Sequence, residues 1–197
     1  MDEISTSLLL VILAVLIFLS AYFSGSETGM MSINRYRLRH LVQSNHRGAK
    51  RVQHLLDRPD RLIGLILIGN NLVNIGASAI ATIICLRWFG DAGIVIATFG
   101  LTLIILIFSE VTPKTIAALH PERVSFPSSL ILLPLLKVMY PVVIGVNAIT
   151  NTFMRILGVN PKQSQMADAL SSEELRTVVN EAGNLIPSSH QEMLVSI

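Results

Sequence analysis

Charged residues are scarce in this chain, and cysteine is almost absent. Asp, Glu, Lys and Arg make up 14% of the 197 residues, whereas 51% are hydrophobic and the mean hydropathy is +0.60. That balance excludes an ordinary soluble domain and indicates an integral membrane protein. The single cysteine, Cys85, excludes an intramolecular disulfide, and we interpret it as a small buried or lipid-facing residue.

The sequence also lacks the patterns of an enzyme, a nucleic-acid-binding protein or a secreted precursor. We find no nucleophile–base pair and no glycine-rich phosphate loop, so we expect no enzyme and no nucleic-acid partner. The chain opens Met1-Asp2-Glu3, without the basic region of a secretory signal, so we expect its first apolar run to span rather than to be cleaved. The histidines have no metal-ligand spacing; they are His40, His46, His54, His120 and His190.

What remains is three long apolar runs, at residues 4–23, 62–86 and 92–112. Each has about 20 residues or more, which is the length that a helix needs to cross a ~30 Å hydrocarbon core. We therefore predict an all-α integral membrane protein with three transmembrane helices, held in a lipid bilayer.

Basic residues predict the orientation of these spans. The N-terminus has no Lys or Arg, and the turn between the second and third spans has only Arg87. Because cytoplasmic loops are enriched in Lys and Arg, we expect the N-terminus outside and both the 35–61 segment and the C-terminus in the cytoplasm. The basic residues of that segment are Arg35, Arg37, Arg39, Arg47, Lys50, Arg51, Arg58 and Arg61.

Two segments beside the spans predict juxtamembrane helices. Residues 27–56 alternate apolar side chains with arginines, and the S-x-x-E spacing from Ser24 to Glu27 predicts a helix start there. Pro59 lies where the next helix would begin. Prolines interrupt the apolar residues 124–157, so we expect short, proline-broken helices along the inner leaflet; a fourth crossing is the alternative. The interrupting residues are Pro127, Pro134, Lys137 and Pro141.

The composition becomes polar after Gly158. Residues 160–165 are typical of a linker, and Ser171-Ser172-Glu173-Glu174 predicts the cap of an amphipathic helix. We therefore divide the chain into a transmembrane domain, residues 1–158, and a linker with a connecting helix, residues 159–197. We expect that helix to lead toward a soluble cytosolic domain.

Glu110 is the residue most out of place, because it ends a long apolar run. A carboxylate near hydrocarbon is costly, so by default it indicates a functional site. Pro113 cannot donate to the Ser109 carbonyl, and we predict a helix break there that frees this carbonyl beside Glu110. Such a pairing of oxygens is typical of cation sites in transporters. A structural salt bridge to Lys114, four residues on, is the alternative.

Polar clusters interrupt all three spans at similar depth, roughly 13–17 Å from the cytoplasmic edge at ~1.5 Å per helical residue. The atoms that these clusters can offer to a metal ion are oxygens, which favours Mg²⁺, Ca²⁺ or Na⁺ over zinc or copper. Taken singly, Asn70 or Asn74 also fits an interhelical hydrogen bond, and Ser24 fits a helix cap. The clusters are Ser24-Gly25-Ser26, Gly69-Asn70-Asn71 with Asn74, and Ser109-Glu110.

At these residues the chain resembles the transmembrane domain of the CNNM/CorC magnesium transporters. The resemblance implies three transmembrane helices with a belt of juxtamembrane helices, assembled as a homodimer in the bacterial inner membrane. It also implies Mg²⁺ export, exchanged for Na⁺, through an inward-facing cavity. The motifs that carry it are Ser24-Gly25-Ser26-Glu27-Thr28-Gly29-Met30-Met31-Ser32, Gly69-Asn70-Asn71-Leu72-Val73-Asn74 and Ser109-Glu110-Val111-Thr112-Pro113-Lys114-Thr115.

The resemblance further implies a set of ion ligands and a neighbouring regulatory module. Pro113 would shape the helix break. In the family a cytosolic CBS-pair module that binds ATP comes after this domain, so ATP would act only through that module. The implied metal ligands are Ser24, Asn70, Asn74 and Glu110, with Ser26, Asn71 and the Ser109 carbonyl as secondary candidates.

We therefore expect a Mg²⁺ exporter. The first alternative is an exporter of Co²⁺ or another divalent cation. The second is a membrane anchor or sensor that transports nothing and serves a cytosolic regulatory module. The coupling ion, its stoichiometry and the direction of transport stay open at this point.

Overall fold

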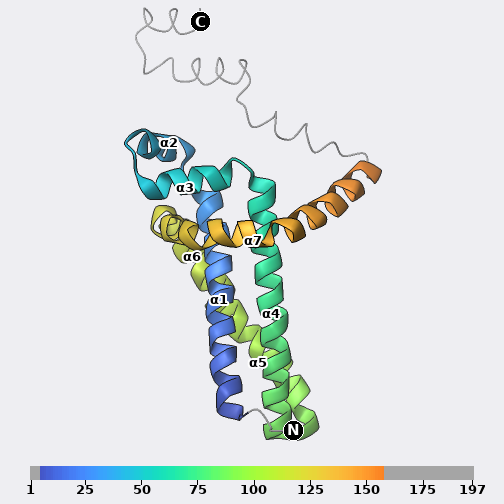
Figure 1. The fold of residues 1–197 in the computed structure, drawn as a ribbon. Coiled ribbons are helices and arrows are strands. Elements are labelled where there is room, and N and C mark those ends of the chain that lie inside the picture. The colour runs from blue at the N-terminus through green and yellow to red at the C-terminus, as the bar shows by residue number, and fades with distance from the viewer. Residues whose placement is uncertain (1–4, 158–197) are drawn as a thin grey trace, which may run out of the picture. The chain divides into compact units, whose positions relative to one another are not determined.

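The computed structural model describes residues 5–157, and all regular structure within them is helical (Figure 1). These residues divide after Asn147 into two compact units, and the candidate site lies in the first. The all-α prediction is confirmed, whereas the predicted connecting helix at 159–197 lies outside the described residues. The helices are α1 Thr6–Ser32, α2 Arg35–Gln43, α3 Arg47–Leu56, α4 Pro59–Phe89, a 3₁₀ turn Gly90–Ala92, α5 Gly93–Ile104, the π-helix η2 Ile105–Val111, α6 Thr112–Leu119 and α7 Pro121–Ile156.

Helix α1 continues through the position where we predicted a new helix to start. It runs unbroken past Ser24 to Ser32, so the S-x-x-E spacing is not a cap. The actual cap is Asn34, whose side chain accepts a 3.0 Å hydrogen bond from the Arg37 backbone N–H. Ser24 is fully buried, and a continuous helix keeps its backbone hydrogen-bonded where no water is available.

The predicted juxtamembrane helix at 27–56 is in fact two helices, α2 and α3. A turn at Ser44–His46 separates them, and Asn45 adopts a φ of 62° there. Asparagine tolerates this left-handed conformation better than most residues, which places the turn at this point.

Helix α4 begins at Pro59, as expected, and extends to Phe89 before the chain reverses. Gly90 has a φ of 59°, which suits glycine. A Cβ on Gly93 would meet the Cys85 carbonyl oxygen, so α5 can start close against α4 only because this residue has no side chain. Figure 1 shows α5 returning alongside α4.

The predicted break at Pro113 is wrong, because the chain stays helical from Gly93 to Leu119. The departure from α geometry lies just before the proline, where η2 is a π-helix and the Thr112 N–H bonds to the Ile107 carbonyl, five residues back. A π turn shifts the hydrogen bonds that precede Pro113, so the missing proline N–H and its ring are accommodated without a break.

Helix α7 also differs from the prediction of short, proline-broken helices. It is a single helix of 36 residues with Pro127, Pro134 and Pro141 inside it. Their spacing of seven places all three on one exposed face, where the carbonyls left unbonded can be solvated and the helix can bend rather than end. By length and composition α7 could cross a membrane.

The contacts of α7 favour the predicted belt over a fourth crossing. They join α7 to Tyr22 of α1, to α3, and to the start of α4. In Figure 1 the same part of α7 runs across α1 and α4 rather than along them. The hydrogen bonds are from Tyr22 Oη to the Ser128 carbonyl at 2.9 Å, from Arg51 Nε to Ser129 Oγ at 3.0 Å, and from Asn147 Nδ2 to the Asp60 carbonyl at 3.4 Å.

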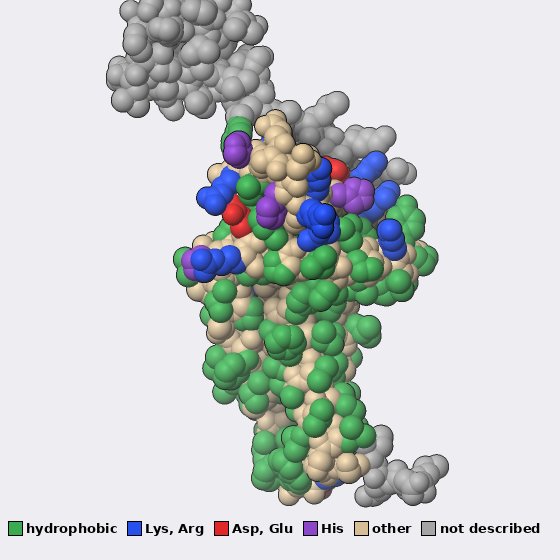
Figure 2. All heavy atoms as spheres, turned by 60° about the vertical axis from the view of Figure 1, so that its left-hand side comes forward, with side chains coloured by type: hydrophobic (Ala, Val, Ile, Leu, Met, Phe, Trp, Pro, Cys, Tyr) green, Lys and Arg blue, Asp and Glu red, His purple; other side chains and the backbone are tan. Residues whose placement is uncertain are grey.

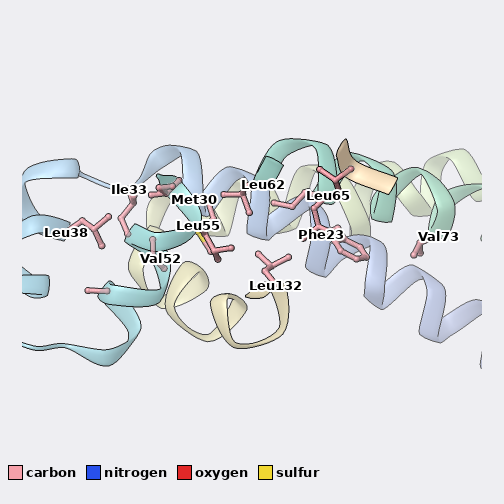
Figure 3. Packing of buried hydrophobic residues seen from close by; sticks show 14 residues of the cluster. Phe23, Met30, Ile33, Leu38, Val52, Leu55, Leu62, Leu65, Val73 and Leu132 are labelled. Atoms are coloured by element: carbon pink, nitrogen blue, oxygen red, sulfur yellow. The ribbon is translucent and has the colours of Figure 1, made fainter. Parts of the chain in front are cut away.

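The apolar core lies where the ends of α1 and α4 meet α2, α3 and α7 (Figure 3). Away from this core α1, α4 and α5 expose large apolar side chains, such as Phe18 and Phe99 at 73% and 70%. Charged side chains gather at the end that carries α2 and α3 (Figure 2). Such an apolar surface is suited to lipid rather than to water.

Three helical stretches within residues 5–157 are long and apolar enough to span a membrane: Thr6–Ser32, Pro59–Leu119 and Pro121–Met154. The middle stretch folds back at Gly90 and supplies two of the three spans that the sequence predicts. Together with the exposed apolar surface, these stretches define a multi-span membrane protein.

Candidate cation site

Glu110 lies between helices α1 and α4, at the point where η2 approaches both. Its Oε2 is 3.5 Å from the Ser24 hydroxyl of α1, and its Oε1 is 3.5 Å from the Asn70 amide nitrogen of α4. The carboxylate side chain is 26% exposed. Three polar clusters far apart in the sequence therefore meet at one level, as the depth count predicted.

Lys114 is the closest partner of Glu110. Its Nζ lies 2.7 Å from Glu110 Oε2, one helical turn further along the chain. The salt bridge that we considered as an alternative is thus present, and it coexists with the contacts from Ser24 and Asn70.

Ser20 orients Asn70, and the sequence reasoning missed it. The Ser20 hydroxyl donates a 3.1 Å hydrogen bond to Asn70 Oδ1, and Ser20 is fully buried. As a result the Asn70 amide presents its N–H, not its oxygen, to Glu110. The position of Ser20 four residues before Ser24, on the same face of α1, is the signal that would have identified it.

Asn74 and Glu110 line one cavity of about 360 Å³ between α4 and the α5–η2 segment. The Asn74 Oδ1 atom is buried and has no hydrogen-bond partner in the described part of the chain. A buried acceptor without a partner carries a desolvation cost, so it indicates a place where a ligand donates or coordinates. The cavity is lined by Asn74, Ser78, Ala97, Thr98, Leu101, Thr102, Ile105, Leu106 and Glu110.

The secondary candidates lie elsewhere. Asn71 is exposed and its amide donates to the Leu67 carbonyl at 2.9 Å, so it serves its own helix. Ser109 is fully buried, and its hydroxyl donates to the Ile17 carbonyl at 3.0 Å, while its carbonyl stays a predicted ligand. Ser26 is fully buried but lies about 200° around α1 from Ser24, since each helical residue turns by about 100°.

Glycines allow the helices to approach closely around the site. A Cβ on Gly25 would lie 3.4 Å from the Pro113 Cβ, so α1 and α6 pack backbone to ring at that point. A Cβ on Gly69 would lie 2.6 Å from the Phe23 ring, which therefore rests against the α4 backbone beside Asn70. Figure 3 shows Phe23 among the buried apolar side chains of the core.

The groups that this site can offer to a cation are one carboxylate, now paired with the Lys114 ammonium, and neutral oxygens. No group of three His, Cys, Asp or Glu side chains comes together anywhere in residues 5–157. Hydroxyl, amide and carboxylate oxygens suit hard cations, and a site of low charge binds them weakly enough for release.

The fold and the site define an α-helical, multi-span membrane protein with a polar cluster inside an otherwise apolar bundle. Comparison with known families identifies the group more closely. Residues 11–188 match the model of the Cyclin M transmembrane N-terminal domain, CNNM. The chain belongs to the CNNM family.

Curated relatives agree with this assignment. The chain is 54% identical over its full length to the UPF0053 inner membrane protein YfjD of Escherichia coli K12, of which it covers 46%. It is 53% identical to a UPF0053 protein of Haemophilus influenzae, of which it covers 47%. Over 90% of its length it is 27% identical to the polyamine export protein of H. influenzae, covering 44% of that protein. The chain thus spans about half the length of these relatives.

Proposed function

We propose that the chain forms the transmembrane part of a Mg²⁺ exporter in the bacterial inner membrane, driven by Na⁺ entry. The observation that carries the proposal is the cavity that joins the Glu110 carboxylate to the Asn74 oxygen, which has no partner within residues 5–157, with Ser24 and Asn70 against the same carboxylate. Ser24 and Asn74 supply oxygens from two helices beside this one acid, and Asn70 would add a third by turning its amide. Such a set of oxygens is suited to a transported hard cation.

To complete the site, an ion would draw the Ser24 and Glu110 oxygens together and turn or displace the donors that now contact Glu110. Mg²⁺ binds oxygen at about 2.0–2.1 Å in octahedral geometry, so neighbouring ligand oxygens lie about 3.0 Å apart. The Ser24 and Glu110 oxygens are 3.5 Å apart, which requires a contraction of about half an ångström. The Asn70 amide would turn its oxygen inward and release Ser20. Because Mg²⁺ dehydrates reluctantly, we expect it to keep some of its water.

The transport cycle that we propose alternates access to this site. Mg²⁺ enters from the cytoplasmic side, which holds α2 and α3, and leaves on the side of the Gly90 turn. Na⁺, a hard cation that the same oxygens can bind, then returns the carrier. We expect two copies to assemble, with the N-terminus outside, and ATP to act through a CBS-pair module beyond the described residues.

A second candidate cargo is a protonated amine. The specific observation in its favour is that Glu110 already holds an alkylammonium group, that of Lys114, at 2.7 Å. The cavity beside it also has apolar lining, including Leu101 and Ile105, that would suit a methylene chain. Because a 27%-identical relative is named a polyamine export protein, the flux assay described next also includes a polyamine.

The test is flux from proteoliposomes that contain the full chain and a Mg²⁺ indicator, with an imposed Na⁺ gradient. Glu110→Gln keeps the shape of the side chain and removes its charge, and we expect at least about tenfold slower Mg²⁺ flux, since it removes the carboxylate of the site. Glu122→Gln is the matched control, because Glu122 is equally exposed, at 26%, and is paired with Arg37 outside the site.

Parallel flux measurements with Co²⁺ or spermidine in place of Mg²⁺ identify the transported cation. Mg²⁺ flux that is equal in wild type and Glu110→Gln would contradict the proposal. Flux of spermidine but not of Mg²⁺, lost in Glu110→Gln, would replace Mg²⁺ by an organic cation. Failure of every cation to move would leave the anchor or sensor role that we considered from the sequence.

A further inference from the structure

Every contact that the structure gives the Glu110 carboxylate comes from a hydrogen-bond donor. The Lys114 ammonium and the Ser24 hydroxyl both approach Oε2, and the Asn70 amide N–H approaches Oε1. A metal ion needs acceptors at these positions. The hydroxyl and the amide can present acceptors by rotating, but an ammonium group has none to offer.

Lys114 and a bound cation therefore compete for one atom. Two positive charges cannot both lie at contact distance from Glu110 Oε2 without strong repulsion in a site of low dielectric. Conversely, a carboxylate left without any cation in this cavity would be costly. The ammonium group at 2.7 Å supplies that neutralising charge.

Lys114 is also able to leave. Its side chain is 42% exposed. It lies on α6, the short helix that ends at Leu119 and leads toward the charged end of the molecule that carries α2 and α3. A lysine on a flexible four-carbon stem can extend its ammonium group toward the aqueous edge while its methylenes stay against apolar surface.

We propose that Lys114 is a tethered competitor for the cation site. It occupies Glu110 when no cargo is bound, the incoming cation displaces it, and its return to the carboxylate helps to expel the cargo. By competing with the cation for Glu110, Lys114 then keeps the affinity of the site low enough for release, and it is not itself a ligand of the cation. This inference rests on the proposed function, because it concerns the same carboxylate.

The experiment combines two measurements on the full chain in detergent micelles. The first is Mg²⁺ affinity by titration calorimetry for wild type, Lys114→Met and Lys114→Arg. The second is the rate at which an amine-specific reagent labels Lys114, read by mass spectrometry with and without Mg²⁺. Lys50→Met is the matched control, because Lys50 is exposed on α3 and bonds to Asn45 outside the site.

We expect Lys114→Met to bind Mg²⁺ about tenfold more tightly and Lys114→Arg to bind it more weakly, because a guanidinium group holds a carboxylate in two bonds. We expect Mg²⁺ to raise the labelling rate of Lys114 several-fold in wild type and Lys50→Met to behave as wild type. A merely structural salt bridge would instead weaken binding in both Lys114 variants.

The outcomes separate this inference from the proposed function. Tight or moderate Mg²⁺ binding by wild type, with Lys114→Met binding no more tightly, would overturn the inference alone. Labelling of wild-type Lys114 that Mg²⁺ does not change would do the same even if the variants fail to fold. Absence of Mg²⁺ binding by folded wild type would overturn the proposed function and this inference with it.

Discussion

Gly69→Ala is expected to disturb the site without touching any of its polar atoms. The added Cβ would lie 2.6 Å from the Phe23 ring, whereas carbon atoms in contact are ordinarily about 3.5–4.0 Å apart. Phe23 is 7% exposed and packs edge-on against Tyr22, with ring centroids 5.6 Å apart, so its ring is held on at least one side. We therefore expect the clash to be relieved in part by a separation of α1 and α4.

The magnitude comes from a comparison with Gly76→Ala. Gly76 lies seven residues further along α4, and its added Cβ would make an ordinary 3.6 Å contact with Leu16. Both substitutions gain the same helix propensity, about 0.5–1 kcal/mol, so this gain cancels between them. The remaining difference is the overpacking at Phe23, which costs about 1–3 kcal/mol.

The assay is reversible unfolding in mixed micelles with increasing SDS, followed by the helical circular dichroism signal, together with Mg²⁺ titration. We expect Gly69→Ala to be less stable than Gly76→Ala by about 1–3 kcal/mol and to bind Mg²⁺ several-fold more weakly, because the 3.5 Å contacts to Glu110 would lengthen beyond hydrogen-bonding range. Phe23→Leu should rescue part of both losses. Equal stability and equal affinity of the two alanine variants would refute the reasoning.

Two further predictions concern Asn74 and the orientation of the chain. Asn74→Ala removes a buried oxygen that has no partner among the described residues, so we expect its free energy of unfolding without Mg²⁺ to equal that of wild type or to be up to about 1 kcal/mol higher, while Mg²⁺ affinity falls about tenfold. Asn71→Ala should change neither quantity. A large loss of stability in Asn74→Ala would argue for a structural role. In a Cys85→Ala background, a membrane-impermeant maleimide should label Asp91→Cys in intact cells and Ser44→Cys only after the membrane is opened. The reverse pattern would contradict the orientation.

Much of the fold could be predicted from local patterns. The apolar run at 62–86 lies within the observed α4, and the run at 92–112 extends from the end of the 3₁₀ turn to the first residue of α6. Both were predictable because a length of about 20 apolar residues is a property of the sequence itself. Glu110 and Pro113 marked the irregular part of the third span for the same reason, since a carboxylate and a missing N–H are costly there whatever surrounds them.

The local signals failed where packing decided the outcome. Ser24 has the residue type and spacing of a cap, yet it lies inside α1, because its neighbours bury it where a helix end would leave backbone groups unbonded. Three prolines did not break α7, because they share a face that points away from the bundle.

The sequence by itself thus determined that the chain is a membrane protein, roughly where its spans lie, and which oxygens were candidates. Only the tertiary structure decided which side chains meet: Ser24, Asn70 and Lys114 contact Glu110, whereas the Asn71 amide and the Ser109 hydroxyl bond to backbone carbonyls elsewhere. The physical reason is that hydropathy and helix propensity act along one segment, whereas contacts between helices depend on their rotation and spacing. Close approaches such as that of Gly69 to Phe23 set those quantities.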